Sequence, residues 1–210
     1  MTIIAVAGTG TDIGKTYVAA ALLRKLRERG TVLAARKPVQ SFAPGDVSTD
    51  ADELADATGV DAHTVCPPHR WLSIPLAPPM AADALGLAPF TIADLAVELR
   101  AGTPVTTPLL VETAGGVRSP IAADGDCAAL IDALDAELVV LVADAGLGTI
   151  NLVRLSVGAL GQHRVIVYLN RFDDGVDLHV RNERWLRARE GLDVVTDIEA
   201  LTARIEPLVR

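Results

Sequence analysis

The fold of this chain is decided near its N-terminus, by the stretch Gly8-Thr9-Gly10-Thr11-Asp12-Ile13-Gly14-Lys15-Thr16. This stretch follows an apolar run, Ile3–Ala7, and precedes a segment with a helical pattern, Tyr17–Arg29. A strand, a glycine-rich loop, Gly-Lys-Thr and a helix, in that order, are typical of a phosphate-binding loop, or P-loop. Small residues let backbone N–H groups surround phosphate oxygens at the positive end of a helix. The stretch therefore predicts binding of a nucleoside triphosphate.

The spacing of this loop departs from the usual pattern by one residue. A standard P-loop has four residues between its first glycine and Gly-Lys-Thr, whereas five separate Gly8 from Gly14. We expect Lys15 to reach the β- and γ-phosphates and the Thr16 hydroxyl to ligate Mg²⁺. An incidental lysine in a β-to-α turn is the alternative, and the flanking strand and helix argue against it. The nucleotide-binding set predicted from this loop is Gly10, Thr11, Asp12, Ile13, Gly14, Lys15 and Thr16.

Length and composition indicate a compact enzyme. We expect the 210 residues to form one α/β domain, residues 1–210, with a core built from aliphatic side chains, because 50% of residues are hydrophobic and only 3% are aromatic. The net charge of −8 argues against nonspecific nucleic-acid binding and against an anionic membrane surface. Cys66 and Cys127 lack metal-ligand spacing and are expected to be reduced thiols. Without a signal peptide or a spanning apolar run, a cytoplasmic location is expected.

Apolar segments alternate with helical patterns along the chain. Their continuous Val, Ile and Leu character is typical of strands that are buried on both faces. The expected strands are Thr2–Ala7, Val32–Arg36, Leu109–Val111, Leu138–Ala143, Val165–Leu169 and Asp193–Val195. The expected helices are Lys15–Glu28, Thr49–Ala57, Thr91–Ala101, Asp126–Leu134, Asn151–Leu160, Val176–Arg189 and Asp197–Leu208. This alternation predicts a three-layer, P-loop NTPase-like α/β fold, with a mostly parallel central sheet and helices on both faces. Pro67–Pro89 is proline-rich and is expected to be a long surface loop.

Ligands of open α/β sheets bind at the carboxyl ends of the strands, where two charged residues are expected. Lys37 follows the second strand and is expected to stabilise charge on a transferring phosphoryl group or a carboxylated intermediate. Glu112 ends the third strand, where a carboxylate commonly ligates Mg²⁺, and Gly115 allows close approach of the backbone. The acidic run Asp46–Glu53 is expected to begin a helix. One of its aspartates is a candidate for a further metal ligand, and the spacing does not choose among them.

The last two strands also end in candidate binding residues. Asp144–Asn151 is a second small-residue loop before a helix, where free N–H groups are suited to a carboxylate or phosphate. An ordinary connection with Thr149 as the helix N-cap is the alternative. Asn170 follows the fifth strand and is a candidate reader of a base edge, and Arg171 is next to it. The four histidines show no metal-ligand spacing and are expected to be non-catalytic.

Five segments in this order resemble the dethiobiotin synthetases. They are the Gly-x5-Gly-Lys-Thr loop, Lys37–Val39, Val111–Gly116, Leu147–Asn151 and Asn170. The resemblance implies an ATP- and Mg²⁺-dependent cyclo-ligase of biotin biosynthesis. Such an enzyme forms dethiobiotin from 7,8-diaminononanoate and CO₂, through a carbamate and a carbamic-phosphoric anhydride.

The resemblance also implies roles for individual residues. Lys37, Lys15 and Thr11 would be catalytic, and Thr16, Asp50 and Glu112 would hold Mg²⁺. The family is homodimeric, so the neighbouring subunit would supply a substrate-carboxylate site. The implied substrate-binding residues are Thr11, Asp12, Lys37, Ser41, Gly148, Thr149, Ile150 and Asn151. Thr113, Met80 and Leu152 depart from the usual family pattern and bear on the choice of amine.

Three other classes of protein compete with this interpretation. A partitioning ATPase usually carries a lysine early in the P-loop, and none lies between Gly8 and Gly14. A cobyrinic-acid-type synthase normally has a glutaminase domain, for which 210 residues leave no room. A small-molecule kinase would need an arginine-rich lid, whereas Arg70 is the only arginine in Pro67–Pro89.

Overall fold

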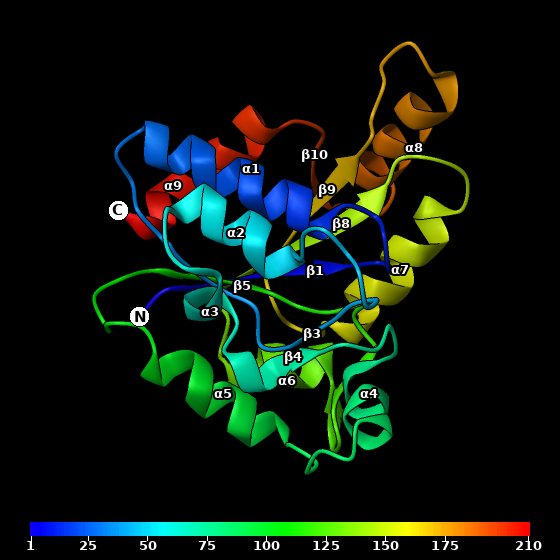
Figure 1. The fold of residues 1–210 in the computed structure, drawn as a ribbon. Helices are drawn as coiled ribbons and strands as arrows, with labels where there is room; N and C mark the ends of the chain where they lie inside the picture. The colour runs from blue at the N-terminus through cyan, green and yellow to red at the C-terminus, as the bar shows by residue number, and fades with distance from the viewer.

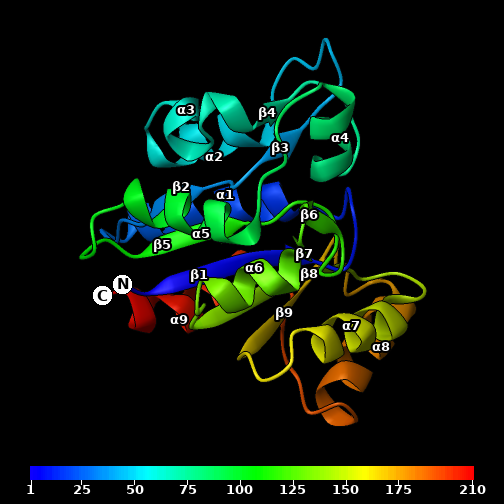
Figure 2. The ribbon, with the colours of Figure 1, turned by 90° about the horizontal axis from the view of Figure 1, so that it is seen from below.

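The computed structural model describes all residues, 1–210. Its centre is a six-stranded sheet in the order β10-β9-β8-β1-β5-β2 (Figures 1 and 2), in which every neighbouring pair is parallel. The strands of this sheet are β1 (Ile3–Gly8), β2 (Ala34–Arg36), β5 (Leu109–Glu112), β8 (Leu138–Asp144), β9 (Val165–Asn170) and β10 (Asp193–Val195). The predicted parallel sheet is therefore confirmed.

Helices cover both faces of the sheet, as Figures 1 and 2 show from two directions. The longer ones are α1 (Lys15–Glu28), α2 (Asp50–Thr58), α5 (Ile92–Ala101), α6 (Cys127–Ala133), α7 (Thr149–Ala159), α8 (Asp177–Ala188) and α9 (Ile198–Val209). The predicted bounds of these helices are correct to within two residues. None of the helices is both long and apolar enough to cross a membrane.

The two faces of β1 show why its residues are continuously apolar. Ile3, Ala5 and Ala7 point into a cluster of 32 buried residues that includes side chains of α5, α6 and α7. Ile4 and Val6 point into a second cluster of 26 buried residues, which includes side chains of α1, α2 and α9. Successive side chains of a strand alternate between its faces, so a strand covered on both sides has no polar face.

The expectation of a structureless loop over Pro67–Pro89 is wrong in part. This segment contains a 3-10 turn, Pro68–Arg70, a short strand β4 (Trp71–Leu72) and helix α4 (Pro78–Ala84). β4 pairs in parallel with β3 (Gln40–Ser41), which the sequence analysis did not predict. A strand of two residues is too short to show a periodic pattern. Two consecutive prolines begin α4, and they suggest the end of a helix although proline is favoured at the first helical position.

Three further small elements were not predicted. Helix α3 (Ala62–Val65) follows α2, and β6 (Pro120–Ala122) pairs antiparallel with β7 (Gly125–Asp126). The β6–β7 pair leads directly into α6. The strand order places β1 between β8 and β5, so the loop after β1 lies where the direction of the sheet connections changes. Such switch points form the ligand crevices of open α/β sheets.

Candidate active site

The loop between β1 and α1 is shaped to hold an anion. The N–H groups from Gly10 to Tyr17 make no hydrogen bond within the protein, and Val18 is the first residue of this stretch whose N–H is bonded, to the Gly14 carbonyl. Lys15 is buried and donates from Nζ to the Gly10 carbonyl at 3.1 Å. Burial and the nearby Lys37 ammonium lower the pKa of Lys15. Free N–H groups in a loop at a helix N-terminus, together with a desolvated ammonium, are the features that bind phosphate.

Close packing explains two glycines of this loop. Gly14 is the N-cap of α1 in a left-handed conformation (φ +91°), and a Cβ there would lie 2.2 Å from Asn170 Nδ2. A Cβ on Gly8 would lie 2.6 Å from Ile13 Cδ1 and 2.9 Å from Lys15 Cδ. Gly8, which makes the spacing of the loop irregular, is therefore required because the Lys15 side chain passes close to it.

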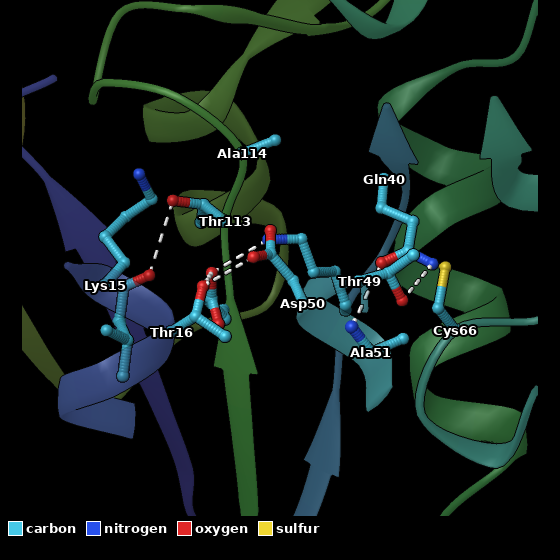
Figure 3. A network of polar contacts seen from close by, with 12 residues as sticks. Lys15, Thr16, Gln40, Thr49, Asp50, Ala51, Cys66, Thr113 and Ala114 are labelled. Carbon is cyan, nitrogen blue, oxygen red and sulfur yellow. Dashed lines mark hydrogen bonds and ion pairs between the residues drawn. The ribbon is translucent and has the colours of Figure 1, made fainter. Parts of the chain in front are cut away.

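Four side chains from distant parts of the sequence meet beside this loop, where Figure 3 shows Thr16 and Asp50 pointing toward one another. The Thr16 hydroxyl lies 2.8 Å from Asp50 Oδ1 and 2.9 Å from Glu112 Oε1. Lys37 Nζ lies 2.8 Å from Glu112 Oε1 and also donates to Asp50. α1, the residue that follows β2, α2 and β5 each supply one of these side chains, so the cluster exists only in the folded chain.

The protonation of the cluster follows from burial and charge. Burial alone would lower the pKa of Lys37, but Glu112 and Asp50 outweigh it and hold this pKa above its ordinary value. Burial alone would raise the pKa of Asp50, and Lys37 reverses that effect, so the Asp50 pKa is lowered. Glu112 has no exposed surface, and its burial together with Asp50 raises its pKa. Lys37 is therefore held as a cation between two unequal carboxyl groups.

The donors present do not satisfy the oxygens of this cluster. Glu112 Oε2 is buried and has no hydrogen-bond partner. The Thr16 hydroxyl has a single proton, yet it lies within hydrogen-bond distance of both Asp50 and Glu112. Two carboxylates and a hydroxyl are hard oxygen donors of the kind that Mg²⁺ prefers. The residues present fit a magnesium ion.

A cavity of about 950 Å³ opens over the loop and the cluster. Its lining includes the apolar side chains of Phe42, Leu76 and Pro78 and is otherwise mostly polar. The predicted site residues that line it are Thr11, Asp12, Gly14, Lys15, Thr16, Lys37, Ser41, Asp50, Glu112 and Gly115. Ser41 Oγ is buried there without a partner.

The structure distinguishes the aspartates of the acidic run. Asp52 closes a capping box with Thr49, the N-cap of α2. Asp46 accepts from the Ala43 N–H at 2.9 Å and belongs to a turn that lines the cavity. Asp50 alone of the three contacts Lys37 and Thr16.

Sequence reasoning missed Gln40, which positions the start of α2. This buried side chain accepts from the Ala51 N–H at 3.0 Å and donates to Thr49 Oγ1 at 3.2 Å (Figure 3). Both partners flank Asp50, so Gln40 fixes the residue that joins the cluster. A polar residue two positions after Pro38, in the strand-end motif Lys-Pro-Val-Gln, was the signal available in the sequence.

Asn170 and Arg171 lie against the outer side of the P-loop and do not line the large cavity. Asn170 donates from Nδ2 to the Ile13 carbonyl at 2.8 Å. Arg171 adopts a left-handed backbone (φ 57°), pairs with Asp144 at 3.0 Å and donates to the Asp12 carbonyl at 2.9 Å. Both residues thus hold the loop from the β9 side.

Gly148, Thr149, Ile150 and Asn151 begin α7 and do not line the large cavity of the same chain. The alternative in which Thr149 is the N-cap is wrong, because Gly148 occupies that position with φ +91° and Thr149 is the first helical residue. The buried Thr149 Oγ1 has no hydrogen-bond partner.

The three unusual positions lie outside the cavity. Thr113 is fully buried, with its hydroxyl 3.4 Å from the Val6 carbonyl, whereas Met80 and Leu152 are exposed. None of the three residues lines the cavity.

Solved structures with low sequence identity share this fold. A plasmid partition protein from Borrelia burgdorferi superposes with a TM-score of 0.54 at 12% identity, covering 99% of this chain and 96% of that one. Chloroplast FtsY from Physcomitrella patens superposes with a TM-score of 0.53 at 16% identity, covering 96% of this chain and 64% of that one. These similarities concern the fold alone.

Sequence relatives identify the family. A family model described as an AAA domain matches residues 2–206. The ATP-dependent dethiobiotin synthetase BioD of Haloferax mediterranei is 38% identical, over 91% of this chain and 82% of that protein. Its namesake in Rhodococcus jostii is 37% identical, over 98% of this chain and 89% of that protein. The chain belongs to the family of ATP-dependent dethiobiotin synthetases.

Proposed function

We propose that this chain is an ATP- and Mg²⁺-dependent cyclo-ligase that forms the ureido ring of dethiobiotin from 7,8-diaminononanoate and CO₂, with residues 1–210 acting as one catalytic domain. The observation that carries the proposal is the cluster of Lys37, Asp50, Glu112 and Thr16 at the end of a phosphate-binding loop. The names of its relatives support the same activity.

The reaction has three steps with balanced atoms. One substrate amine attacks CO₂ and loses a proton, which gives a carbamate. A carbamate oxygen attacks the γ-phosphorus of ATP, which gives a carbamic-phosphoric anhydride and ADP. The second amine attacks the carbonyl carbon and loses a proton, the C–O bond to phosphate breaks, and the ring closes as inorganic phosphate leaves with its electron pair.

In this proposal, Lys15 and Lys37 stabilise negative charge at different places. Lys15 leaves the Gly10 carbonyl and donates to the transferring phosphoryl group, together with the free N–H groups of the loop. Lys37 is held as an ammonium by Asp50 and Glu112 and donates to the carbamate. Fixed donors aimed at developing charge are effective because they need no reorganisation during the reaction.

Thr16, Asp50 and Glu112 would hold Mg²⁺, and the unpartnered Glu112 Oε2 supports this assignment. When bound, Mg²⁺ would neutralise charge on the β- and γ-phosphates of ATP. The proposed magnesium ligands leave Lys37 hydrogen-bonded to Asp50 and Glu112, so the cation keeps its position.

The diamine is proposed to lie in the large cavity, beside the phosphate loop. Thr11 and Asp12 would contact its amines, and the unpartnered Ser41 hydroxyl would accept or donate a hydrogen bond. The apolar side chains of Leu76 and Pro78, which line the cavity, suit the hydrocarbon chain. The contacts of Asn170 and Arg171 with the loop support a place for the base beside β9.

We further infer a homodimer in which the start of α7 serves the partner's site. Gly148, Thr149, Ile150 and Asn151 lie outside the cavity of their own chain, and the Thr149 hydroxyl has no partner. A helix N-terminus with a free hydroxyl suits the substrate carboxylate. A two-fold dimer would bring each α7 to the other chain's site.

A mass-resolved assay with MgATP, bicarbonate and 7,8-diaminononanoate tests the proposed function. Formation of dethiobiotin with one ADP for each ring is the expected result. A matched reaction without the diamine should release little ADP. ATP hydrolysis that continues at the same rate without the diamine, and yields no cyclic urea, would instead support a nucleotide-driven switch of the partitioning type.

A further inference from the structure

A second cavity, of about 240 Å³, lies where the residues after β2 meet the C-terminal end of α5. None of its lining residues lines the larger cavity. Val65, Pro67 and Leu99 give it apolar walls, and Arg36 supplies a guanidinium. It is smaller than the roughly 300–1,000 Å³ that is usual for sites of drug-sized ligands, so any ligand must be small.

Arg36 is buried without an anionic partner. The residue is only 8% exposed, and no carboxylate forms an ion pair with it. Nη1 donates to the Ala35 carbonyl at 2.9 Å, and Nη2 donates to the Gly102 carbonyl at the end of α5. A guanidinium has five N–H groups, so three of them have no acceptor in the protein.

The one acid that lines this cavity is already engaged. Glu98 binds Arg70 through both oxygens, at 3.0 and 2.6 Å, and lies 3.4 Å from His69. The Arg70 guanidinium is itself fixed over the Phe90 ring, 4.2 Å from its centroid. Glu98 is thus part of a separate ion pair. Burial lowers the pKa of Arg36, as expected for a charge that lacks a carboxylate partner.

We propose that this second cavity binds a small monocarboxylate with an apolar body, whose carboxylate pairs with Arg36. Two carboxylate oxygens match the planar fork of a guanidinium, and three of its N–H groups are available. The apolar walls at Val65, Pro67 and Leu99 would cover the rest of the ligand. This inference does not depend on the proposed ligase activity.

The position of the cavity gives such a ligand a place next to the catalytic cluster. The Lys37 N–H donates to the Val65 carbonyl at 2.9 Å, and Val65 lines the cavity. Arg36 and Lys37 are consecutive residues, so an occupant of the second cavity would contact the segment that carries the catalytic lysine.

The test uses the full chain and 4-fluorobenzoate, whose binding is followed by ¹⁹F NMR and calorimetry. We expect saturable binding of one molecule per chain, with weaker binding of the neutral 4-fluorobenzamide and of inorganic phosphate. Arg36→Met should weaken binding of 4-fluorobenzoate about tenfold or more, because it removes a charge-assisted pair of hydrogen bonds.

A second variant keeps the proposal testable if Arg36→Met does not fold. Thr64 lines the cavity and is exposed, so Thr64→Trp should obstruct the opening and abolish binding while Arg36 stays in place. Thr106→Trp is the matched control at an exposed position that lines neither cavity, and it should bind normally. Equal binding of the benzamide or of phosphate, no saturable binding, or full binding by either folded variant, Arg36→Met or Thr64→Trp, would overturn the proposal.

Discussion

Lys37 and Glu112 form an ion pair that is buried on both sides, with 2.8 Å between Nζ and Oε1. Their side chains are 2% and 0% exposed, and the second oxygen of Glu112 has no partner. Burial of such a pair contributes little net stability, but removing one partner leaves an uncompensated charge. Stability alone therefore does not account for the pair, whereas the function proposed for Lys37 and Glu112 does.

Lys37→Met should lower kcat about 100-fold or more and change ATP affinity much less, because Lys37 is proposed to act on developing charge. Turnover and nucleotide binding are measured separately, by product formation and by calorimetry. Lys25→Met is the control, since Lys25 pairs with Glu28 and Glu199 at the surface and should retain activity. Equal losses of turnover and affinity would make Lys37 a nucleotide anchor only.

The same variant has a stability effect that can be separated from catalysis. Lys37→Met should destabilise the protein by about 3–5 kcal/mol, because Glu112 is left buried without its cation. Adding Glu112→Gln should recover part of this loss without restoring turnover. Denaturant unfolding of the two variants measures the difference, and an equally unstable double variant would contradict the explanation.

Glu112→Gln should raise the Mg²⁺ concentration required for half-maximal activity, by about 10- to 100-fold. The amide keeps the shape of the carboxyl group but supplies one neutral oxygen in place of two anionic ones. Activity is titrated with Mg²⁺ at saturating ATP. Glu137→Gln, at an exposed position, should leave the requirement unchanged. An unaltered Mg²⁺ requirement in Glu112→Gln would remove this residue from the metal site.

Stability should fall in acid partly through Asp50. The pKa of Asp50 is lowered in the folded protein, chiefly by Lys37 against the opposing effect of burial. Near pH 3.8, the ordinary pKa, the unfolded chain therefore binds more protons than the folded protein. The stabilisation from the Asp50–Lys37 contact is present above that pH and is lost as the pH falls through the lowered pKa. Asp50→Asn should show a shallower decline in unfolding free energy below about pH 4 than the unaltered protein.

The control for this experiment is Asp174→Asn, at an exposed position of the loop before α8. Its unfolding free energy should decline with pH as that of the unaltered protein does. A decline in Asp50→Asn as steep as that of the control would show that the Asp50–Lys37 contact has no part in acid stability.

Gly8→Ala should destabilise the protein by about 1–3 kcal/mol and weaken ATP binding, because the added methyl would overlap Ile13 and the Lys15 stem. Gly10→Ala is the matched control for stability, since the nearest atom to its Cβ would be 4.0 Å away. Thermal unfolding without nucleotide compares the two variants. The same unfolding temperature for both would refute the packing explanation of the irregular spacing.

Mixing two inactive variants tests whether α7 acts across a dimer. Lys37→Met damages the cluster, and Thr149→Trp would block the start of α7. If these sites combine in trans, each mixed dimer has one intact site. Statistical mixing should then restore about a quarter of the full activity. Sedimentation checks that the mixture is dimeric. If activity does not recover in a dimeric mixture, the start of α7 either serves the site of its own chain or has no part in the reaction.

The sequence by itself determined the fold class and the residues at the centre of the candidate site. Strands rich in apolar residues are covered on both faces, and this pattern predicted the six strands of the central sheet, although β2 and β10 each also carry a charged residue, Arg36 and Asp193. The glycine-rich loop could also be predicted from the sequence, because the conformation of a Gly-Lys-Thr segment between a strand and a helix depends mainly on residues nearby in the chain. Lys37 and Glu112 followed from one further rule, that parallel strands place their carboxyl ends at a common edge.

Only the tertiary structure decided which polar residues meet. Asp46, Asp50 and Asp52 are equivalent in spacing, and the choice of Asp50 depends on how Gln40 holds the start of α2. β3 and β4 are too short to have a period. In the sequence, Arg36 is an ordinary cation at the end of a strand. Only the structure shows that the C-terminal end of α5 packs against it. Local sequence patterns indicate which faces of a strand or helix are buried. Contacts between distant segments depend on how whole helices and strands pack together.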